Sequence, residues 1–215
     1  MSKKVKITEY AEKLKKKSFN PADVRPPRDL SPWPENNKGL ILEVGCGVGL
    51  HPILWAKKPQ HQRLLLIACE RTQEKFEKFN RRFENHRFNN ILPIHEDALH
   101  WLCSHYEKTR EAFEKIFFLY PNPYPKENQR NKRFLGMPSF TIYLQSLQRG
   151  GVIELRTNIK EYLEEARFLA HAVWNLTVVY AGELREEDDK GVTHFERKYL
   201  KRGETCYLLL LKKED

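Results

Sequence analysis

The sequence contains no apolar run as long as the roughly 18 residues that a membrane-spanning helix needs, so no membrane segment is expected. Its basic first residues, Met1 to Lys6, are not followed by an apolar secretory segment, so no signal peptide is expected either. The cysteines are few and form neither a CxxC pair nor a metal-type spacing: Cys46, Cys69, Cys103 and Cys206. We therefore expect buried, reduced thiols, no metal site and a cytoplasmic protein.

Acidic residues are too few to balance the basic ones. The 38 Lys and Arg residues exceed the 29 Asp and Glu residues, which gives a formal net charge of +9 with histidine neutral. This excess favours a polyanionic partner such as tRNA or another RNA, although an anionic membrane surface or an ordinary solvated surface is compatible with the same total. The basic residues form three groups: Lys3, Lys4, Lys6, Lys13, Lys15, Lys16 and Lys17; Lys126, Arg130, Lys132 and Arg133; and Arg197, Lys198, Lys201 and Arg202. The last two groups flank the candidate site described below, which favours RNA.

The chain also lacks internal repeats and low-complexity tracts, and its 215 residues are enough for one sizeable domain with a short extension. Residues 1–38 are predicted to form a basic, proline-containing N-terminal arm. A short helix over 7–17 is expected there, followed by a segment whose prolines exclude regular structure: Pro21, Pro26, Pro27, Pro32 and Pro34. Residues 39–215 are predicted to form the domain itself.

From residue 39 onward, short apolar runs alternate with helical patterns. Strands are predicted at 40–44, 63–69, 91–94, 113–120, 152–156, 176–180 and 206–212. Helices are predicted at 50–58, 72–85, 98–105, 134–147 and 160–174, and 183–202 is predicted to be a polar connection. The alternation predicts an α/β fold with a doubly wound, mostly parallel seven-stranded sheet. No helix is expected between the last two strands, so the last strand is predicted to be antiparallel.

A glycine-rich loop with glycines at Gly45, Gly47 and Gly49 follows the first predicted strand and begins a helix. Glycines let the backbone turn sharply and approach a ligand, and the helix start offers unpaired N–H groups. The dinucleotide fingerprint would place its third glycine where Leu50 stands. With Glu43 before it, the loop resembles the first motif of S-adenosylmethionine-dependent methyltransferases. That resemblance implies a Rossmann-like fold and a Glu43 carboxylate near the methionine amino group; a purely structural glycine turn is the alternative.

Acidic residues also end the next two predicted strands. Glu70 comes about 25 residues after the first glycine, where a carboxylate can bind both ribose hydroxyls of a nucleoside. Asp97 follows the third strand, and the methyltransferase resemblance implies that Asp97 and Ala98 line an adenine pocket. Either acid alone could be a solvated strand-end residue. Because ligands of such sheets bind at the carboxyl ends of the strands, the ordered set predicts a cofactor site.

The segment Tyr120-Pro-Asn-Pro-Tyr-Pro-Lys126 follows the fourth predicted strand. Its alternating prolines exclude a helix and an inner strand, so we expect a rigid loop that presents Asn122 and Tyr124 at the carboxyl edge of the sheet. An asparagine offers a donor and an acceptor to the edge of a base, and an aromatic ring can stack on it. We predict that Asn122 is the catalytic residue at the reaction centre, the alternative being a stiff turn without such a role.

Further elements follow in the order known from one family. They are the Pro121-Asn-Pro-Tyr-Pro-Lys126 segment, a basic stretch, Gly150-Gly151, Thr157-Asn158 and Thr193-His-Phe-Glu-Arg197. From about residue 39 to 212 the chain resembles the tRNA (guanine-N7-)-methyltransferase family, whose pattern is P-D-P-W-P-K, G-G, T-D and T-x-F-E-x-R. The resemblance implies S-adenosylmethionine as cofactor and a guanine of tRNA as substrate. It implies substrate-side roles for Lys126, Asn158, Thr193, Glu196 and Arg197, with Thr193 and Glu196 holding cofactor or guanine and Arg197 supporting their loop.

Two acids and a tryptophan of that family pattern are replaced in this chain. Asn122 and Asn158 stand where the family has acids, and Tyr124 stands where it has tryptophan. A carboxylate accepts from guanine N1–H and N2–H together, whereas an amide accepts only through its oxygen, so guanine recognition is expected to be weakened or retuned. The segment also partly resembles the N-P-P-Y signature of amino-group methyltransferases. An exocyclic amine of a base, a small-molecule substrate and a non-catalytic RNA-binding relative therefore stay open as alternatives.

Overall fold

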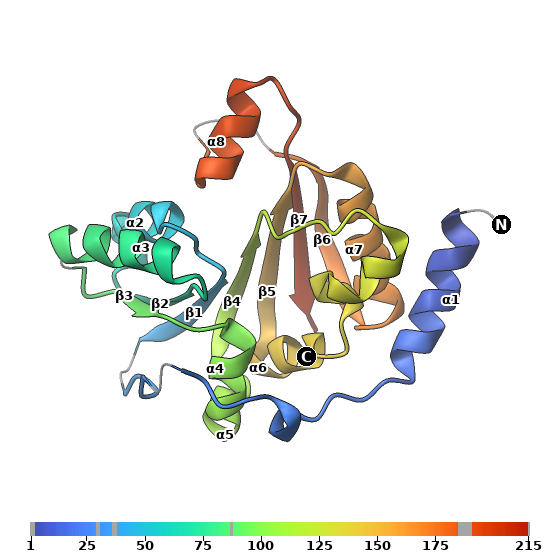
Figure 1. The fold of residues 1–215 in the computed structure, drawn as a ribbon, viewed down its shortest axis with the longest axis horizontal. Helices are drawn as coiled ribbons and strands as arrows, with labels where there is room; N and C mark the ends of the chain where they lie inside the picture. Colours follow the sequence, from blue (N-terminus) through green and yellow to red (C-terminus); the bar gives the residue numbers. More distant parts are fainter. Residues whose placement is uncertain (1–2, 29–30, 36–37, 87, 185–190, 215) are drawn as a thin grey trace.

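Seven strands form a single twisted sheet (Figure 1) in a computed structural model that describes residues 3–28, 31–35, 38–86, 88–184 and 191–214. The strand order is β3-β2-β1-β4-β5-β7-β6. Strands β1 to β5 pair in parallel, whereas β7 is antiparallel to both β5 and β6. The strands are β1 Gly39–Val44, β2 Leu64–Cys69, β3 Ile91–Ile94, β4 Phe113–Leu119, β5 Leu147–Thr157, β6 Leu176–Glu183 and β7 Tyr207–Lys213. The predicted mostly parallel α/β sheet with an antiparallel last strand is confirmed.

Helices cover both faces of this sheet. The α-helices are α1 Lys3–Lys15, α2 Leu50–Ala56, α3 Gln73–His86, α4 Ala98–Ser104, α5 Tyr106–Thr109, α6 Phe140–Ser146, α7 Lys160–Ala172 and α8 His194–Lys201. Short 3₁₀ turns are η1 Pro21–Asp23, η2 Pro59–His61, η3 Glu127–Lys132 and η4 Phe134–Gly136. In the described part of the chain, every helix is too short or too polar to cross a membrane.

Consecutive residues of β1 point to opposite faces of the sheet and contribute to two separate cores. Leu42, together with Ile67 of β2, packs in the core under α4, α6 and α7. Ile41, together with Leu66 of β2, packs in the core under α2 and α3. This alternation is the two-residue period of a strand. Because both faces are covered, β2 is apolar throughout and β1 and β4 are mostly apolar, which is why these strands could be found as apolar runs.

The prediction of a single helix over 134–147 is wrong. The structure instead forms η4, a break, and then α6. Pro138 lies in the break, where it has no N–H to donate and disfavours a helical conformation in the residue before it. Strand β5 then begins at Leu147, earlier than expected, and contains Gly150 with a φ of 71°.

The connection 183–202 was predicted as a polar stretch without a helix, and the structure corrects this with α8. Residues 185–190 of that stretch lie outside the described residues. Thr193 caps α8, because its Oγ1 accepts a hydrogen bond from the backbone N–H of Glu196 at 3.0 Å. Helix α8 lies above the ends of β4 and β5 in Figure 1, which makes it part of the site edge.

The N-terminal segment packs against the rest of the protein. Ala11 and Leu14 of α1 are buried in the core that α7 covers. The Tyr10 hydroxyl donates to the carbonyl oxygen of Gly136 at 2.6 Å. Further along, the ring of Trp33 stacks on that of Trp101 in α4, with the ring centres 5.4 Å apart. These contacts take the chain along the lower edge of the sheet in Figure 1, away from α8.

Candidate active site

The glycine loop lies at the carboxyl end of β1, and its conformation depends on its glycines. Gly47 has a φ of 62° and Gly49 a φ of 77°, a region that other residues rarely adopt. A Cβ built on Gly49 would lie 2.0 Å from the ring of Phe79, so this glycine lets α3 pack against the loop. A Cβ on Gly45 or Gly47 would meet no heavy atom within 4 Å. The loop therefore has room for a ligand over its first two glycines.

Glu70 lies against this loop at the carboxyl end of β2. Its Oε2 accepts from the backbone N–H of Gly47 at 2.9 Å, and its Oε1 accepts from that of Thr72 at 2.7 Å. The residue is only 5% exposed, so both hydrogen bonds are formed by a largely desolvated carboxylate. The structure thus brings Glu70 and the glycine loop together, and the ribose contact stays a prediction.

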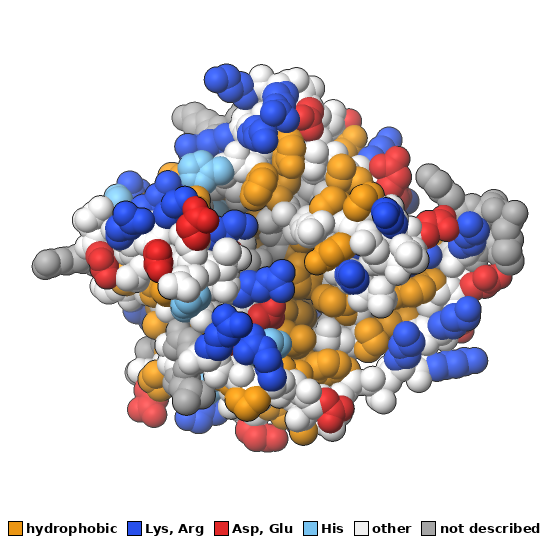
Figure 2. Space-filling view, in the orientation of Figure 1, with side chains coloured by type: hydrophobic (Ala, Val, Ile, Leu, Met, Phe, Trp, Pro, Cys, Tyr) orange, Lys and Arg blue, Asp and Glu red, His pale blue; other side chains and the backbone are white. Residues whose placement is uncertain are grey.

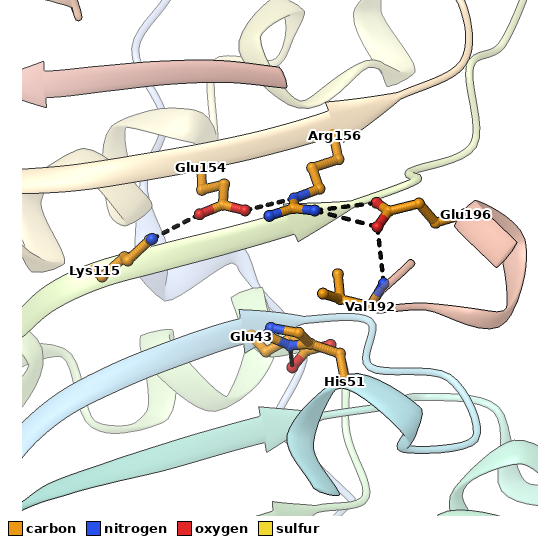
Figure 3. Close-up of polar contacts among 7 residues, drawn as sticks. All are labelled: Glu43, His51, Lys115, Glu154, Arg156, Val192 and Glu196. Atoms are coloured by element: carbon orange, nitrogen blue, oxygen red, sulfur yellow. Dashed lines mark hydrogen bonds and ion pairs between the residues drawn. The ribbon is translucent and has the colours of Figure 1, made fainter. Parts of the chain in front are cut away.

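Glu43 is buried beneath the loop and pairs with a histidine that the sequence interpretation did not include. Its Oε2 lies 2.7 Å from Nδ1 of His51, near the start of α2 (Figure 3). The edge of the His51 ring meets the ring of Phe117 in β4, with ring centres 4.8 Å apart. Strand β1 and helix α2 are therefore joined on either side of the loop, which holds its shape.

Asp97 caps α4 at the end of β3. Its Oδ1 accepts from the backbone N–H of Leu99 at 3.0 Å, and Arg71 lies 3.9 Å from its other oxygen. Ala98 is buried at the start of the same helix. The Asp97 side chain is 31% exposed, so its carboxylate remains partly open to a ligand. The adenine role of the pair stays a prediction.

Glu96, which the sequence interpretation missed, fastens the N-terminal segment beside Asp97. The buried carboxylate accepts from the backbone N–H of Arg28, from that of Asp97 at 2.7 Å, and from the Arg25 side chain at 3.3 Å. Burial alone would raise the pKa of Glu96, but these donors and cations outweigh it and lower the pKa. Residues 25–28 therefore lie beside the predicted cofactor residue Asp97.

The proline segment leaves β4 in a tight conformation. Tyr120 and Tyr124 both have positive φ angles, 52° and 43°. The Asn122 Oδ1 accepts from the backbone N–H of Tyr124 at 3.2 Å, which closes a small side-chain turn. The carbonyl oxygen of Tyr124 accepts from Arg133 at 2.8 and 3.1 Å. Asn122 and Tyr124 are thus presented by a loop fastened at both ends, and the catalytic role of Asn122 stays a prediction.

Part of the basic stretch behind this loop has a structural role. Arg130 and Arg133 each lie 2.7 Å from the Glu165 carboxylate of α7, with side chains 13% exposed. They belong to the basic group that was expected to favour RNA, but their guanidinium groups face Glu165. Lys126 and Lys132 are exposed, and the Lys132 Nζ lies 5.8 Å from the centre of the Tyr124 ring. Only these lysines of the group are open to an anionic partner.

A chain of charged side chains, buried apart from the partly exposed Lys115, connects β4, β5 and α8 (Figure 3). The Glu154 carboxylate lies 2.6 Å from Lys115 on one side and 2.6 Å from Arg156 on the other. The Arg156 Nη1 donates to Glu196 at 3.2 Å, and Glu196 also accepts from the backbone N–H of Val192 at 2.8 Å. Burial alone would raise the pKa of Glu154, but Lys115 and Arg156 lower it to about 2.

This chain places the Thr193-to-Arg197 element over the sheet. Glu196 is fully buried, and Thr193 caps the helix that carries it. The Arg197 Nε donates to the carbonyl oxygen of Gly191 at 3.0 Å, so Arg197 does contact its own loop. Lys115, Glu154 and Arg156 were not among the predicted site residues, because nothing in their sequence spacing indicates that they are neighbours.

Asn158 has a carboxylate partner from a distant segment. Its Nδ2 donates to Glu204 Oε2 at 3.1 Å, just before β7 begins. The pairing of Thr157 with Tyr207 puts the end of β5 level with the start of β7, which explains the contact. The Glu204 side chain is 38% exposed. Glu204 was missed because it becomes a neighbour of Asn158 only through the pairing register of β7 on β5, which the sequence does not reveal.

Arg82 of α3 contacts both the glycine loop and helix α8. Its Nη1 donates to the carbonyl oxygen of Val48 in the glycine loop at 2.8 Å and lies 3.2 Å from Nε2 of His194, the first residue of α8. Burial lowers the pKa of His194, and the nearby Arg82 and Arg197 lower it further, so the ring is neutral at pH 7 and can accept from Arg82. The predicted cofactor and substrate elements therefore meet at one sheet edge.

Within the described residues, no cluster of three or more His, Cys, Asp or Glu side chains is placed to hold a metal ion. A cavity of about 310 Å³ lies between α1 and α6, lined by Leu14, Phe19, Tyr106, Ile142 and Trp174 among others. None of the predicted site residues lines it. The candidate active site is therefore the carboxyl edge of the sheet under α8.

The strand order, the glycine turn after β1 and the acids after β2 and β3 define the class, a Rossmann-like methyltransferase. A family model described as "Putative methyltransferase" matches residues 37–209, and the chain belongs to this methyltransferase family. The fold recurs in the 30S ribosomal A1408 methyltransferase from an uncultured bacterium, with a TM-score of 0.55 and 17% identity over 82% of this chain and 88% of that one.

Relatives with a named activity are also similar over most of this chain. The tRNA (guanine-N(7)-)-methyltransferase of Rhodococcus jostii is 30% identical over 178 residues, which cover 82% of this chain and 67% of that protein. The enzyme of the same name from Aquifex aeolicus is 28% identical over 81% of this chain. The chain spans 56% of the Aquifex protein's length. The resemblance noted from the sequence is thus confirmed.

Proposed function

We propose that this chain transfers a methyl group from S-adenosylmethionine to N7 of a guanine in tRNA. The observation that carries the proposal is the meeting of two elements at one sheet edge. The glycine loop and the Thr193-to-Arg197 element lie far apart in the sequence, and Arg82 contacts both of them. The named activity of the similar bacterial enzymes supports the same substrate.

The residues at this edge fit the proposed cofactor. The space over Gly45 and Gly47 admits a ligand to the loop backbone. Glu70 would bind the ribose hydroxyls, Asp97 would accept from the adenine amine beside Ala98, and Glu43 would lie toward the amino-acid end. When bound, the cofactor supplies an electrophilic methyl group on a sulfonium. The carboxyl edge of the sheet would hold that group, and the Asn122 loop would lie beside it.

Methylation at guanine N7 requires little proton transfer from the protein. N7 carries a lone pair and no proton, so no general base is needed. The contribution of the chain is therefore alignment of the base and electrostatic stabilisation around the reacting atoms. The proline segment suits this role, because Asn122 fixes its own turn and Arg133 holds the carbonyl oxygen of Tyr124.

Asn158 and Glu204 supply a base-recognition pair in this proposal. A Glu204 carboxylate can accept from guanine N1–H and N2–H together, while the Asn158 amide keeps a second N–H for O6. Adenine presents an unprotonated N1 to the same carboxylate, so the pair favours guanine. In this chain Glu204 thereby provides the acidic group that the amide at Asn158 does not.

The experiment that tests the proposal is incubation of the protein with labelled S-adenosylmethionine and unmodified tRNA transcripts, followed by nucleoside analysis. 7-Methylguanosine is the expected product. N2-methylguanosine or N6-methyladenosine would instead establish the exocyclic-amine alternative that Asn122 leaves open. If calorimetry detects binding of neither S-adenosylmethionine nor S-adenosylhomocysteine, the enzymatic proposal is wrong.

Asn122→Asp is expected to raise 7-methylguanosine formation by about tenfold. Either carboxylate oxygen can accept from the Tyr124 N–H, so the turn is preserved while a charge is added beside the base. Initial rates at saturating cofactor measure the effect. Asn122→Ala is the control, since it removes the turn-closing bond and should lower the rate. A lower rate for the aspartate variant would show that the site requires an amide.

Glu204→Gln is expected to lower kcat/KM for tRNA by about 10- to 100-fold, because a hydrogen bond to a charged group contributes about 1.5–3 kcal/mol. Glutamine keeps the size and the bond from Asn158 but cannot accept from both guanine N–H groups. Glu164→Gln, on the exposed side of α7, is the matched control and should behave like the unchanged protein. Equal activity of Glu204→Gln and Glu164→Gln would show that Glu204 does not take part in base recognition.

A further inference from the structure

Helix α8 exposes an aromatic ring beside the candidate active site. Phe195 is 52% exposed, and Val179 of β6 is the other large hydrophobic side chain that is exposed in the described part of the chain. A single exposed hydrophobic side chain is ordinary on a protein surface, so the informative observation is the position of Phe195 beside the candidate active site and not its exposure alone. Glu196 and Thr193 fix the helix that carries it, so the ring is presented in a defined position.

Phe195 is the outer member of a row of three rings, which we call the aromatic row: Phe195, Tyr199 and Tyr120. Phe195 and Tyr199 are four residues apart on α8, so they share one face of the helix. Their rings are stacked, with centres 6.4 Å apart and planes 23° apart. Tyr199 then meets Tyr120, with ring centres 5.7 Å apart. Tyr120 begins the proline segment, so the row leads from solvent to the predicted reaction centre.

Basic side chains are exposed on the same helix and directly after it. Lys198 and Lys201 of α8 are exposed, as are Arg197 and Arg202. Figure 2 shows Lys and Arg side chains over α8 at the top and over α3 at the left, with hydrophobic side chains between them. An exposed ring among cations fits a ligand that is both planar and anionic. The flat faces of nucleotide bases and their phosphates have that combination.

We propose that the aromatic row is a stacking platform for an unpaired base of the RNA substrate, with the α8 cations contacting the flanking phosphates. The inference rests on the proposed function for the identity of the RNA. Phe195 stacks directly on the base, Tyr199 supports Phe195, and Tyr120 connects the platform to the Asn122 loop. Stacking tolerates any base, so the row contributes affinity and orientation, whereas the Asn158 and Glu204 pair selects guanine.

Phe195→Ala tests the platform. We expect this variant to bind tRNA about 10- to 100-fold more weakly, because a base then loses its aromatic partner. Phe195→Trp keeps a stacking face and should restore binding to within about threefold of the unchanged protein. Val179→Ala removes a similarly exposed apolar group from another element and is the control. Fluorescence anisotropy with labelled tRNA measures affinity without any turnover, and calorimetry should give the same cofactor affinity for all variants.

The outcomes separate this inference from the proposed function. If the unchanged protein forms 7-methylguanosine and Phe195→Ala binds tRNA equally well, the platform is wrong and the function stands. If no methylated guanosine forms but Phe195→Ala still loses RNA affinity and tryptophan restores it, the platform stands and the function is wrong. Light scattering could instead show that the unchanged protein is a dimer and that Phe195→Ala is not, with the same RNA affinity for both. The aromatic row would then serve self-association, and the inference would be wrong.

Discussion

Replacing Gly47 by valine is expected to weaken S-adenosylmethionine binding by more than about 100-fold, which corresponds to about 2.7 kcal/mol. Gly47 has a φ of 62°, which a β-branched residue can adopt only with strain. The valine side chain would also project into the space over the loop, where nothing now lies within 4 Å. Relaxing the strain would move the Gly47 N–H away from Glu70, which it now meets at 2.9 Å.

Gly150→Val is the matched control for this variant. Gly150 has a φ of 71° and equally open surroundings, but it lies near the start of β5, at the opposite edge of the sheet. Both variants should lose comparable stability in urea denaturation, whereas only Gly47→Val should lose cofactor binding in calorimetry. Normal cofactor affinity in Gly47→Val would exclude the glycine loop as the binding element.

The inner part of the fold was predictable because it is encoded locally. Strands such as 63–69 are buried on both faces and therefore appear as continuous apolar runs. Helix α8 was missed because it is short and Glu196 is its only buried residue, so no stripe of buried apolar side chains marks it. A signal was nevertheless present: Thr193 followed three residues later by Glu196 is a capping-box pattern, and Thr193 does cap the helix.

The composition of the site was only partly predictable. Glycines and strand-end acids are short-range signals, so the loop and Glu70 could be placed together in advance. The partners that set their environment come from elsewhere in the chain. Glu204 meets Asn158 through the register of β7 on β5, and Arg82 meets the glycine loop through the packing of α3. Such contacts depend on tertiary structure, and no spacing rule in a single sequence indicates them.

Arg156→Met is expected to lower the free energy of unfolding by about 3–5 kcal/mol at pH 7. Arg156 lies between the buried carboxylates of Glu154 and Glu196, and methionine would leave both without its charge. Arg167→Met is the control, because its partner Glu164 is exposed and such surface pairs contribute about 0–1 kcal/mol. Urea denaturation measures both. A loss below about 1 kcal/mol for Arg156→Met would mean that α8 is held by other contacts.

The pH dependence provides an independent check on the same chain of charges. Glu154 has its pKa lowered from 4.5 to about 2, so its stabilising contribution is complete above about pH 4.5 and is lost as the pH falls toward 2. In Arg156→Met only Lys115 remains beside Glu154, so the pKa of Glu154 rises and the carboxylate takes up a proton at a higher pH. Protonation removes the negative charge of Glu154 that has lost its arginine partner. The difference in unfolding free energy between the unchanged protein and the variant should therefore narrow between pH 7 and pH 4. A constant difference across that range would mean that the lost stability comes from packing and not from the charge of Glu154, which requires the arginine only in its ionised form.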